Sequence, residues 1–235
     1  MRGCFVTGTG TGVGKTVLAA AICAALRARG ERVVAFKPVV TGTDEPPAPG
    51  WPPDHELLAA ATGGRPEAVA PVTFGPAVSP HLAAELAGRP LDPAALLRSF
   101  QAAAAGAGAV VAEGVGGLLV PLTRDWLVRD FAVAAGLPLV IAAQPGLGTI
   151  NHTLLTIEAA RSAGLTVAAV VLGPWPSEPT PVEADNRATV ERLGGVETAT
   201  LPGLRQGDPA LLAEAGAALP LDRWLSAACG PPSSA

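Results

Sequence analysis

At 235 residues the chain has the length of one domain with a full sheet-and-helix core, so we expect a single domain over residues 1–235, frayed at 229–235. A net charge of -4 with scattered arginines argues against a nucleic-acid surface, and no apolar run reaches the ~18 residues that suggest a membrane span. No signal-peptide pattern precedes the first apolar segment, which predicts a cytoplasmic protein.

Short apolar runs alternate with stretches rich in Ala and Leu, which predicts an α/β fold in three layers, with a mostly parallel sheet flanked by helices. Strands are expected at residues 3–7, 33–37, 109–113, 138–143, 167–172 and 197–201. Helices are expected at residues 15–29, 54–62, 80–87, 93–105, 126–135, 151–163 and 182–193. Gly30 is expected to end the first helix, and the Pro- and Gly-rich segment 43–53 is expected to be a loop.

Cysteine and lysine are both scarce. Cys4, Cys23 and Cys229 are odd in number and lack the spacing of metal ligands, so reduced thiols are expected. Of 16 basic residues only Lys15 and Lys37 are lysines, and the excess of Ala, Pro, Gly and Arg indicates a coding bias that replaces Lys with Arg. A lysine kept against that bias indicates a site that needs a compact ammonium group.

The strongest motif lies between the first strand and the first helix and reads Gly8-Thr-Gly-Thr-Gly-Val-Gly-Lys15-Thr16. This is the setting of a P-loop, whose backbone N–H groups surround phosphates at a helix N-terminus, so the fold is predicted to be P-loop NTPase-like. In such a loop Lys15 bridges β- and γ-phosphate oxygens, and the Thr16 hydroxyl binds Mg²⁺. Thr9 stands where the usual pattern has a glycine, so a longer or deviant loop is expected.

Three charged residues stand at strand ends or helix starts. Lys37 lies at the carboxyl end of a strand, the edge where open α/β sheets bind ligands. Glu113 ends a buried-type strand before a glycine turn, as the second Mg²⁺ ligand of P-loop enzymes does. Asp54 opens the helix after the Pro-rich loop, where it caps the helix, reaches a metal, or does both. Two ammonium groups beside one metal suit phosphoryl transfer to an anionic oxygen.

Taken together, five segments resemble those of the dethiobiotin synthetase family in order and spacing: residues 8–16, Lys37-Pro38 with Thr41-Gly42, Ser79-Pro80-His81, Glu113 to Gly117, and Gly148 to His152. The resemblance implies an ATP-dependent cyclo-ligase of biotin biosynthesis, which converts 7,8-diaminopelargonic acid and CO₂ to dethiobiotin. In this family a substrate amine captures CO₂ as a carbamate, and ATP phosphorylates the carbamate oxygen. The second amine then attacks the mixed anhydride, which closes the ring and releases phosphate.

The resemblance also implies roles for individual residues. The catalytic residues are Thr11, Lys15 and Lys37, and the metal ligands are Thr16, Asp54 and Glu113. Nucleotide binding is implied for Gly12, Val13, Gly14, Lys15, Thr16, Val17, Gly173, Pro202, Gly203 and Leu204. Substrate binding is implied for Thr41, Gly116, Gly117, Thr149, Ile150, Asn151 and His152.

The segment 148–152 implies a homodimer, because in this family it comes from the other subunit. Its helix-terminal N–H groups receive the tail carboxylate of the substrate. Asn151 and His152 also have a structural interpretation of equal weight, in which Asn151 caps the helix and His152 pairs locally. Neither a nucleic acid nor a membrane is implied as a partner.

Two features depart from the family pattern. Many members have an asparagine that reads the adenine edge where this chain has Gly173. Base recognition then rests on backbone groups, so a relaxed nucleotide preference is expected, with CTP or other triphosphates accepted beside ATP. A tyrosine that some relatives have near the substrate tail has no counterpart, and Asn186 stands in that region as an alternative contact for the carboxylate.

Three other functions stay open. A related amidoligase or cobyrinate-type synthetase usually carries a glutaminase domain, for which the chain is too short and its cysteines wrongly placed. A switch ATPase of the ParA/MinD kind carries an extra lysine near the start of its loop, which is absent here, and no amphipathic basic helix is found. The third alternative is a protein that binds its ligand without catalysis, and the intact set of charged residues argues against it.

Overall fold

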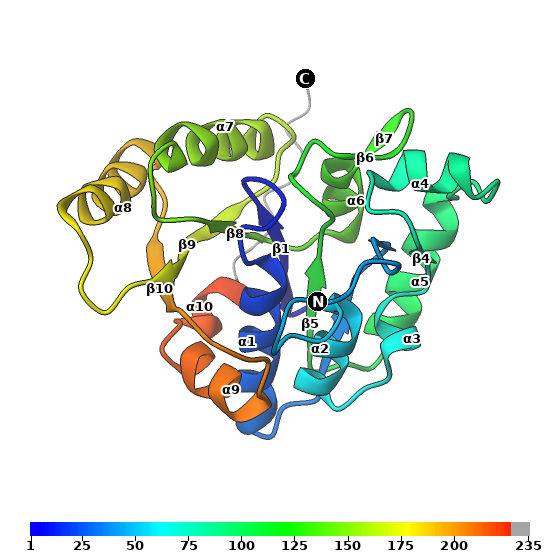
Figure 1. Ribbon diagram of the computed structural model, residues 1–235, viewed down its shortest axis with the longest axis horizontal. Helices are drawn as coiled ribbons and strands as arrows, with labels where there is room; N and C mark the ends of the chain where they lie inside the picture. The colour runs from blue at the N-terminus through cyan, green and yellow to red at the C-terminus, as the bar shows by residue number, and fades with distance from the viewer. Residues whose placement is uncertain (227–235) are drawn as a thin grey trace.

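A parallel sheet of six strands forms the centre of the protein, whose computed structural model describes residues 1–226 (Figure 1). The strand order is β10-β9-β8-β1-β5-β2, and every neighbouring pair is parallel. The strands are β1 (Gly3–Gly8), β2 (Val33–Phe36), β5 (Ala109–Glu113), β8 (Leu139–Ala143), β9 (Val167–Trp175) and β10 (Thr198–Pro202). After β1 the chain first builds the β5 side and then the β8 side, so the strand order reverses beside β1, the position that binds ligands in open α/β sheets.

Helices cover both faces of this sheet, which gives the three layers expected for an α/β domain. The helices are α1 (Lys15–Ala28), α2 (Asp54–Thr62), α3 (Pro66–Val69), α4 (Pro80–Leu86), α5 (Pro93–Ala104), α6 (Val128–Ala135), α7 (Thr149–Arg161), α8 (Pro181–Gly194), α9 (Pro209–Ala217) and α10 (Leu221–Leu225). Two small sheets pair β3 (Val40–Thr41) with β4 (Thr73–Phe74) and β6 (Pro121–Thr123) with β7 (Trp126–Leu127).

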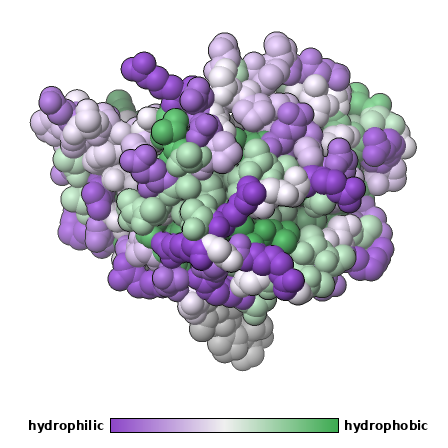
Figure 2. All heavy atoms as spheres, turned by 90° about the horizontal axis from the view of Figure 1, so that it is seen from below, coloured by the Kyte–Doolittle hydropathy of each residue, from purple (hydrophilic) through white to green (hydrophobic). Residues whose placement is uncertain are grey.

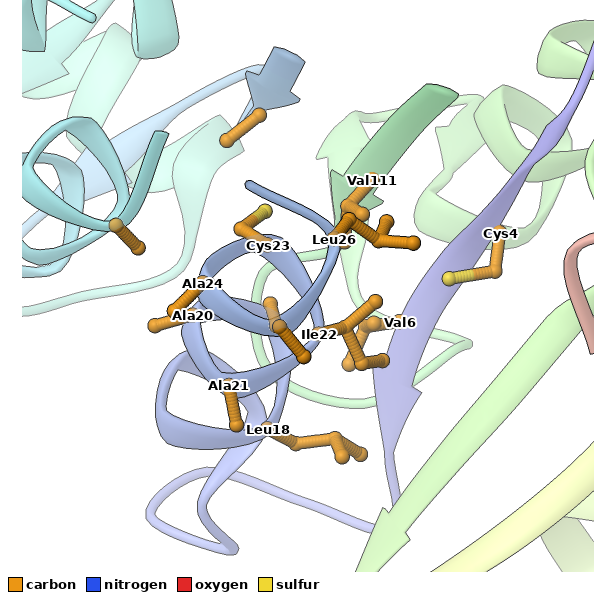
Figure 3. Packing of buried hydrophobic residues seen from close by; sticks show 14 of the residues in the cluster. Cys4, Val6, Leu18, Ala20, Ala21, Ile22, Cys23, Ala24, Leu26 and Val111 are labelled. Atoms are coloured by element: carbon orange, nitrogen blue, oxygen red, sulfur yellow. The ribbon is translucent and has the colours of Figure 1, made fainter. Parts of the chain in front are cut away.

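The alternation of side chains along β1 separates the two larger apolar clusters. Cys4 and Val6 belong to the cluster that β1 shares with α1, α2, α9 and α10, whereas Phe5 belongs to the cluster on the side of α5 and α6. In Figure 3, Ile22 of α1 points toward Val6 of β1. Gly216 of α9 brings that helix against α1, because a Cβ there would overlap the backbone of Ala21. The surface below these helices carries hydrophilic side chains between small apolar areas (Figure 2), an ordinary solvated face.

The structure confirms the six predicted strands and the seven predicted helices, with shifts of a few residues at their ends. Gly30 follows the end of α1 with a φ of 80°, as a helix-ending glycine does. Segment 43–53 contains no helix or strand, as expected. The sequence did not predict α3, α9, α10 or the four short strands, β3, β4, β6 and β7.

The predicted helix 126–135 was wrong at its start, because Trp126 and Leu127 form β7. This strand pairs with β6 through a two-residue turn, and the carboxylate of Asp130 accepts a hydrogen bond from the Leu127 N–H at 2.8 Å. That bond satisfies a free N–H at the helix end and fixes the start of α6 at Val128.

Cys4 and Cys23 are buried free thiols, as expected, and burial raises the pKa of Cys4 to about 12. Cys229 and the predicted frayed tail 229–235 lie outside the described residues. Within residues 1–226, no helix combines the length and the apolar character needed to cross a bilayer.

Candidate active site

The loop between β1 and α1 has the backbone of a phosphate-binding turn. Gly12 and Gly14 adopt φ values of 73° and 86°, and Gly14 is the N-cap of α1. A Cβ on Gly8 would lie 2.6 Å from a methyl group of Val13, so the loop requires glycine at residue 8 rather than at residue 9. The ammonium group of Lys15 donates to the carbonyl of Gly10 at 2.7 Å, which folds the lysine back over the loop. The deviant P-loop predicted from the sequence is therefore formed.

Beside this loop, four side chains from four elements meet at the carboxyl edge of the sheet. Nζ of Lys37, just after β2, donates to Oε1 of Glu113 at the end of β5 at 2.7 Å. Lys37 also donates to Asp54 at the start of α2, and the Thr16 hydroxyl donates to the same Oε1 of Glu113 at 2.9 Å. The sequence predicted each residue separately, and the fold brings them into one ionic cluster.

Burial and mutual charge decide the ionisation in this cluster. Burial would lower the pKa of Lys37, but the negative charges of Glu113 and Asp54 and the hydrogen bonds to both outweigh it and raise that pKa. Burial raises the pKa of Glu113, against the opposing charge of Lys37. For Asp54 burial also acts upward, but the charge of Lys37, the hydrogen bonds to Lys37 and Thr16 and the charge of Lys15 together outweigh it and lower the pKa. The burial of Lys15 lowers its pKa. Lys37 is thus held as a cation between two carboxyl groups.

The same cluster offers ligands suited to a magnesium ion. Glu113 is fully buried, and its Oε2 has no hydrogen-bond partner in the part of the chain that the structure describes. Buried carboxylate oxygens normally find a partner. Thr16, Asp54 and Glu113 supply one hydroxyl and two carboxylates, the small protein ligand set that Mg²⁺ uses beside phosphates and water. Residues 1–226 hold no group of three or more His, Cys, Asp or Glu side chains arranged to bind a metal by themselves.

Asp54 is not the N-cap of α2. Pro53 holds that position, Asp54 is the first helical residue, and no side chain among residues 1–226 caps this helix end. The Asp54 side chain is 48% exposed and turns toward Lys37. Of the roles considered from the sequence, capping is therefore wrong, and the carboxylate is directed into the ionic cluster.

A cavity of about 760 Å³ opens beside the cluster. Of the residues predicted as site residues, those that line it are Thr11, Gly12, Gly14, Lys15, Thr16, Val17, Lys37, Thr41, Asp54 and Gly116. The residues that the sequence analysis missed include Glu45, Ala48, Trp51 and Pro52, all from the Pro- and Gly-rich loop 43–53. The only signal in the sequence was the proximity of this loop to Lys37 and Asp54 along the chain.

The residues predicted to contact the nucleotide base lie together at the ends of β9 and β10, outside the lining of this cavity. A Cβ on Gly173 would lie 3.1 Å from the carbonyl oxygen of Leu201, and one on Gly203 would lie 3.4 Å from Cβ of Pro174. The two segments therefore approach at backbone distance, with little room for a side chain at residue 173.

The start of α7 does not contribute to the lining of the cavity of its own chain. Gly148 is the N-cap with a φ of 90°, so residues 148–152 begin a helix as expected, and Asn151 lies inside the helix rather than capping it. Thr149 is buried, Asn151 and His152 are exposed, and none of the three lines the cavity. The buried side chain of Asn186 donates to the carbonyls of Pro145 and Gly146 at 2.9 and 3.1 Å, which fixes the loop before α7.

Comparison with known proteins decides the family. The chain matches a family model described as "AAA domain" over residues 2–209. It is 47% identical over 195 residues to a protein of Anaeromyxobacter dehalogenans (strain 2CP-1 / ATCC BAA-258) named "ATP-dependent dethiobiotin synthetase BioD", with 82% of this chain and 86% of that protein covered. The chain belongs to the dethiobiotin synthetase family.

A second dethiobiotin synthetase, that of Mycobacterium avium (strain 104), is 39% identical over 229 residues, with 96% of this chain and 98% of that protein covered. Among solved structures, chloroplast FtsY from Physcomitrella patens matches with a TM-score of 0.52 at 16% identity over 92% of this chain. This chain spans 64% of the length of that structure, and the likeness supports the fold alone. The resemblance inferred from the sequence is thus confirmed, and with it the P-loop NTPase-like fold.

Proposed function

We propose that this protein closes the ureido ring of dethiobiotin from 7,8-diaminopelargonic acid and CO₂ at the expense of ATP. Membership of the family supports the overall reaction. The observation that carries the residue-level mechanism is the position of Lys37, a buried cation between Glu113 and Asp54 at the mouth of the P-loop. A fixed ammonium group there stabilises charge on a phosphoryl group that passes to an anionic acceptor.

In the proposed reaction one substrate amine adds to CO₂ and loses a proton, which gives a carbamate. A carbamate oxygen attacks the γ-phosphorus of ATP, the bond to the β–γ bridging oxygen breaks, and ADP leaves. The second amine attacks the carbamoyl carbon of the mixed anhydride, the carbon–oxygen bond to phosphate breaks, and phosphate leaves with closure of the ring. Thr11 and Lys15 hold the phosphates, Lys37 faces the transferred group, and Thr41 and Gly116 line the same cavity on the acceptor side.

We propose that Thr16, Asp54 and Glu113 hold Mg²⁺ when nucleotide binds. A bound ion would supply positive charge beside the phosphate oxygens of the nucleotide. The unpartnered Oε2 of Glu113 supports this assignment. Lys37 also holds Glu113 and Asp54 in position, since it donates a hydrogen bond to each carboxylate.

We propose further that the substrate tail binds across a homodimer. Thr149 to His152 lie on a helix start that does not line the cavity of their own chain, which favours their contact with a substrate held by a second copy. The free N–H groups of a helix N-terminus suit a carboxylate. Leu147, next to this helix start, is 98% exposed and Leu155 of α7 is 55% exposed, so a partner on this surface would remove apolar area from water.

The test is phosphate release from ATP with Mg²⁺ and bicarbonate, with and without 7,8-diaminopelargonic acid. Release is expected to depend on the diamine, and Lys37→Gln is expected to lower it by ~10²-fold or more. Arg98→Gln is the matched control, because Arg98 is an exposed cation on α5 outside the cavity lining. Equal phosphate release without the diamine would contradict the proposed reaction and favour a switch ATPase.

A further inference from the structure

The cavity beside the ionic cluster has a second, apolar part that the proposed catalytic residues do not occupy. Val17, Trp51, Pro52 and Leu57 line the same cavity as Lys15 and Thr16. Val17 and Trp51 are half-buried and pack against the main apolar cluster, to which Leu57 belongs. A cation-rich phosphate site that continues into an apolar wall is the arrangement expected for a ligand with one charged and one flat, weakly polar part.

The loop that carries Trp51 is held against the loop that follows β10. The Gly207 N–H donates to the carbonyl of Gly50 at 3.1 Å. A Cβ on Gly207 would lie 2.6 Å from Cδ1 of Leu57 and 3.6 Å from Cε3 of Trp51, so a larger residue here would displace Leu57. The loop beside Trp51 is therefore held by a backbone hydrogen bond, and the Trp51 side chain packs against the apolar cluster.

These two loops meet over the start of α1. Loop 43–53 leads into α2, and residues 203–208 lead into α9; both helices pack on α1. If the base lies toward Pro202–Leu204, as the family resemblance implies, a nucleotide with its phosphates at Lys15 runs along the first turn of α1 at Val17. Trp51 and Leu57 stand beside that turn, since they line the same cavity as Val17.

The geometry points to Trp51 as a nucleotide-contacting residue, whose indole packs against the ribose and base of the triphosphate as these leave the P-loop. The inference rests on triphosphate binding at the P-loop and is independent of ring closure. An indole face stacks on any base with little regard to its hydrogen-bonding edge. Trp51 would thus hold the nucleoside in a chain whose residue 173 offers no side chain to read the base.

The test measures binding, by calorimetry, of Mg²⁺ with a non-hydrolysable ATP analogue (AMP-PNP) and of Mg²⁺ with inorganic tripolyphosphate. Trp51→Ala is expected to raise the dissociation constant of AMP-PNP about tenfold, to leave that of tripolyphosphate unchanged, and to be rescued mostly by Trp51→Phe. Trp126→Phe, at a tryptophan outside the cavity lining, is the matched control and is expected to change neither constant. Trp51→Leu keeps an apolar side chain in the loop and is expected to resemble Trp51→Ala.

Three results would overturn this assignment. An equal loss for AMP-PNP and tripolyphosphate would show that Trp51 only maintains the phosphate site. No loss for AMP-PNP, or full rescue by leucine, would exclude a contact between the aromatic face and the nucleoside. Because no diamine is present, failure here is separate from failure of the ring-closing function, which diamine-dependent phosphate release tests.

Discussion

Lys37 and Glu113 form a buried ion pair, with 2.7 Å between Nζ and Oε1, where β2 and β5 end side by side. The Lys37 side chain is 5% exposed and that of Glu113 is 0% exposed, so water screens this pair very little. Buried ion pairs of this kind contribute little net stability, but the loss of one partner is costly, because the other charge stays buried. The pair therefore links the stability of the domain to the site that it serves.

Glu113→Gln is expected to lower both stability and activity. It leaves Lys37 with Asp54 as its remaining anionic partner, so the free energy of unfolding should fall by about 2–4 kcal/mol. It also removes a proposed magnesium ligand, so turnover should fall by ~10²-fold, with a higher Mg²⁺ requirement. Urea unfolding and turnover at varied Mg²⁺ measure the two effects. Glu85→Gln is the control, since its pair with Arg124 lies on the surface, where water and salt screen it, and its loss should leave stability nearly unchanged. Unchanged stability and Mg²⁺ dependence in Glu113→Gln would refute both roles.

In the apolar cluster on the side of α5 and α6, Phe131 is expected to be the aromatic residue whose replacement lowers stability most. It is fully buried, and its ring centroid lies within 6.1 Å of each of four other rings: Phe5, Phe36, Phe100 and Trp126. Phe131→Ala removes these contacts and leaves a cavity, so the free energy of unfolding should fall by about 3–5 kcal/mol. Phe131→Leu should cost less, because it fills part of the space. Chemical denaturation of both variants measures the difference, and a loss below ~1 kcal/mol for alanine would contradict this packing.

The sequence predicted the central sheet because parallel strands are buried on both faces and appear as short continuous apolar runs. It also predicted Lys15, Lys37 and Glu113 as site residues, since each stands at a strand end or helix start. Those positions fix where a side chain emerges. Their mutual contact follows from strand order, because β2 and β5 are neighbours in the sheet.

What could not be predicted depends on contacts between distant segments. Trp51 lines the cavity because Gly50 and Gly207 meet, and nothing in either local sequence indicates that contact. A strand of only two residues, such as β3, is too short to show an alternating pattern in the sequence. The helix α9 packs on α1 through Gly216. Glycine is unfavourable inside helices, so its presence in this segment did not indicate a helix.

The enzyme is expected to use several nucleoside triphosphates. Gly173 offers no side chain to the base, and its Cβ position lies 3.1 Å from the carbonyl of Leu201, so the wall there is backbone. Discrimination between bases is strong only where a buried side chain forms hydrogen bonds with one of them. Turnover with ATP, CTP, GTP and UTP should therefore agree within about tenfold. Strict dependence on ATP would contradict this prediction.

Leu147→Asp is expected to weaken both self-association and substrate binding. Leu147 is 98% exposed beside the start of α7, and Leu155 on the same helix is 55% exposed, so burial against a second copy would remove apolar surface from water. Burial of one leucine side chain stabilises an interface by ~1.5–3 kcal/mol, so its loss should raise the dissociation constant of the dimer by at least tenfold. Sedimentation velocity measures this change.

The kinetic consequence separates a shared substrate site from simple dimerisation. If the start of α7 receives the substrate tail across the interface, the KM for the diamine should rise in Leu147→Asp while the KM for ATP stays unchanged. Leu211→Asp, on α9 at the opposite end of the molecule in Figure 1, is the matched control, since Leu211 is also exposed (39%). A wild-type protein that is monomeric at micromolar concentration and fully active would exclude the shared site, because residues 149–152 would then have no cavity to face.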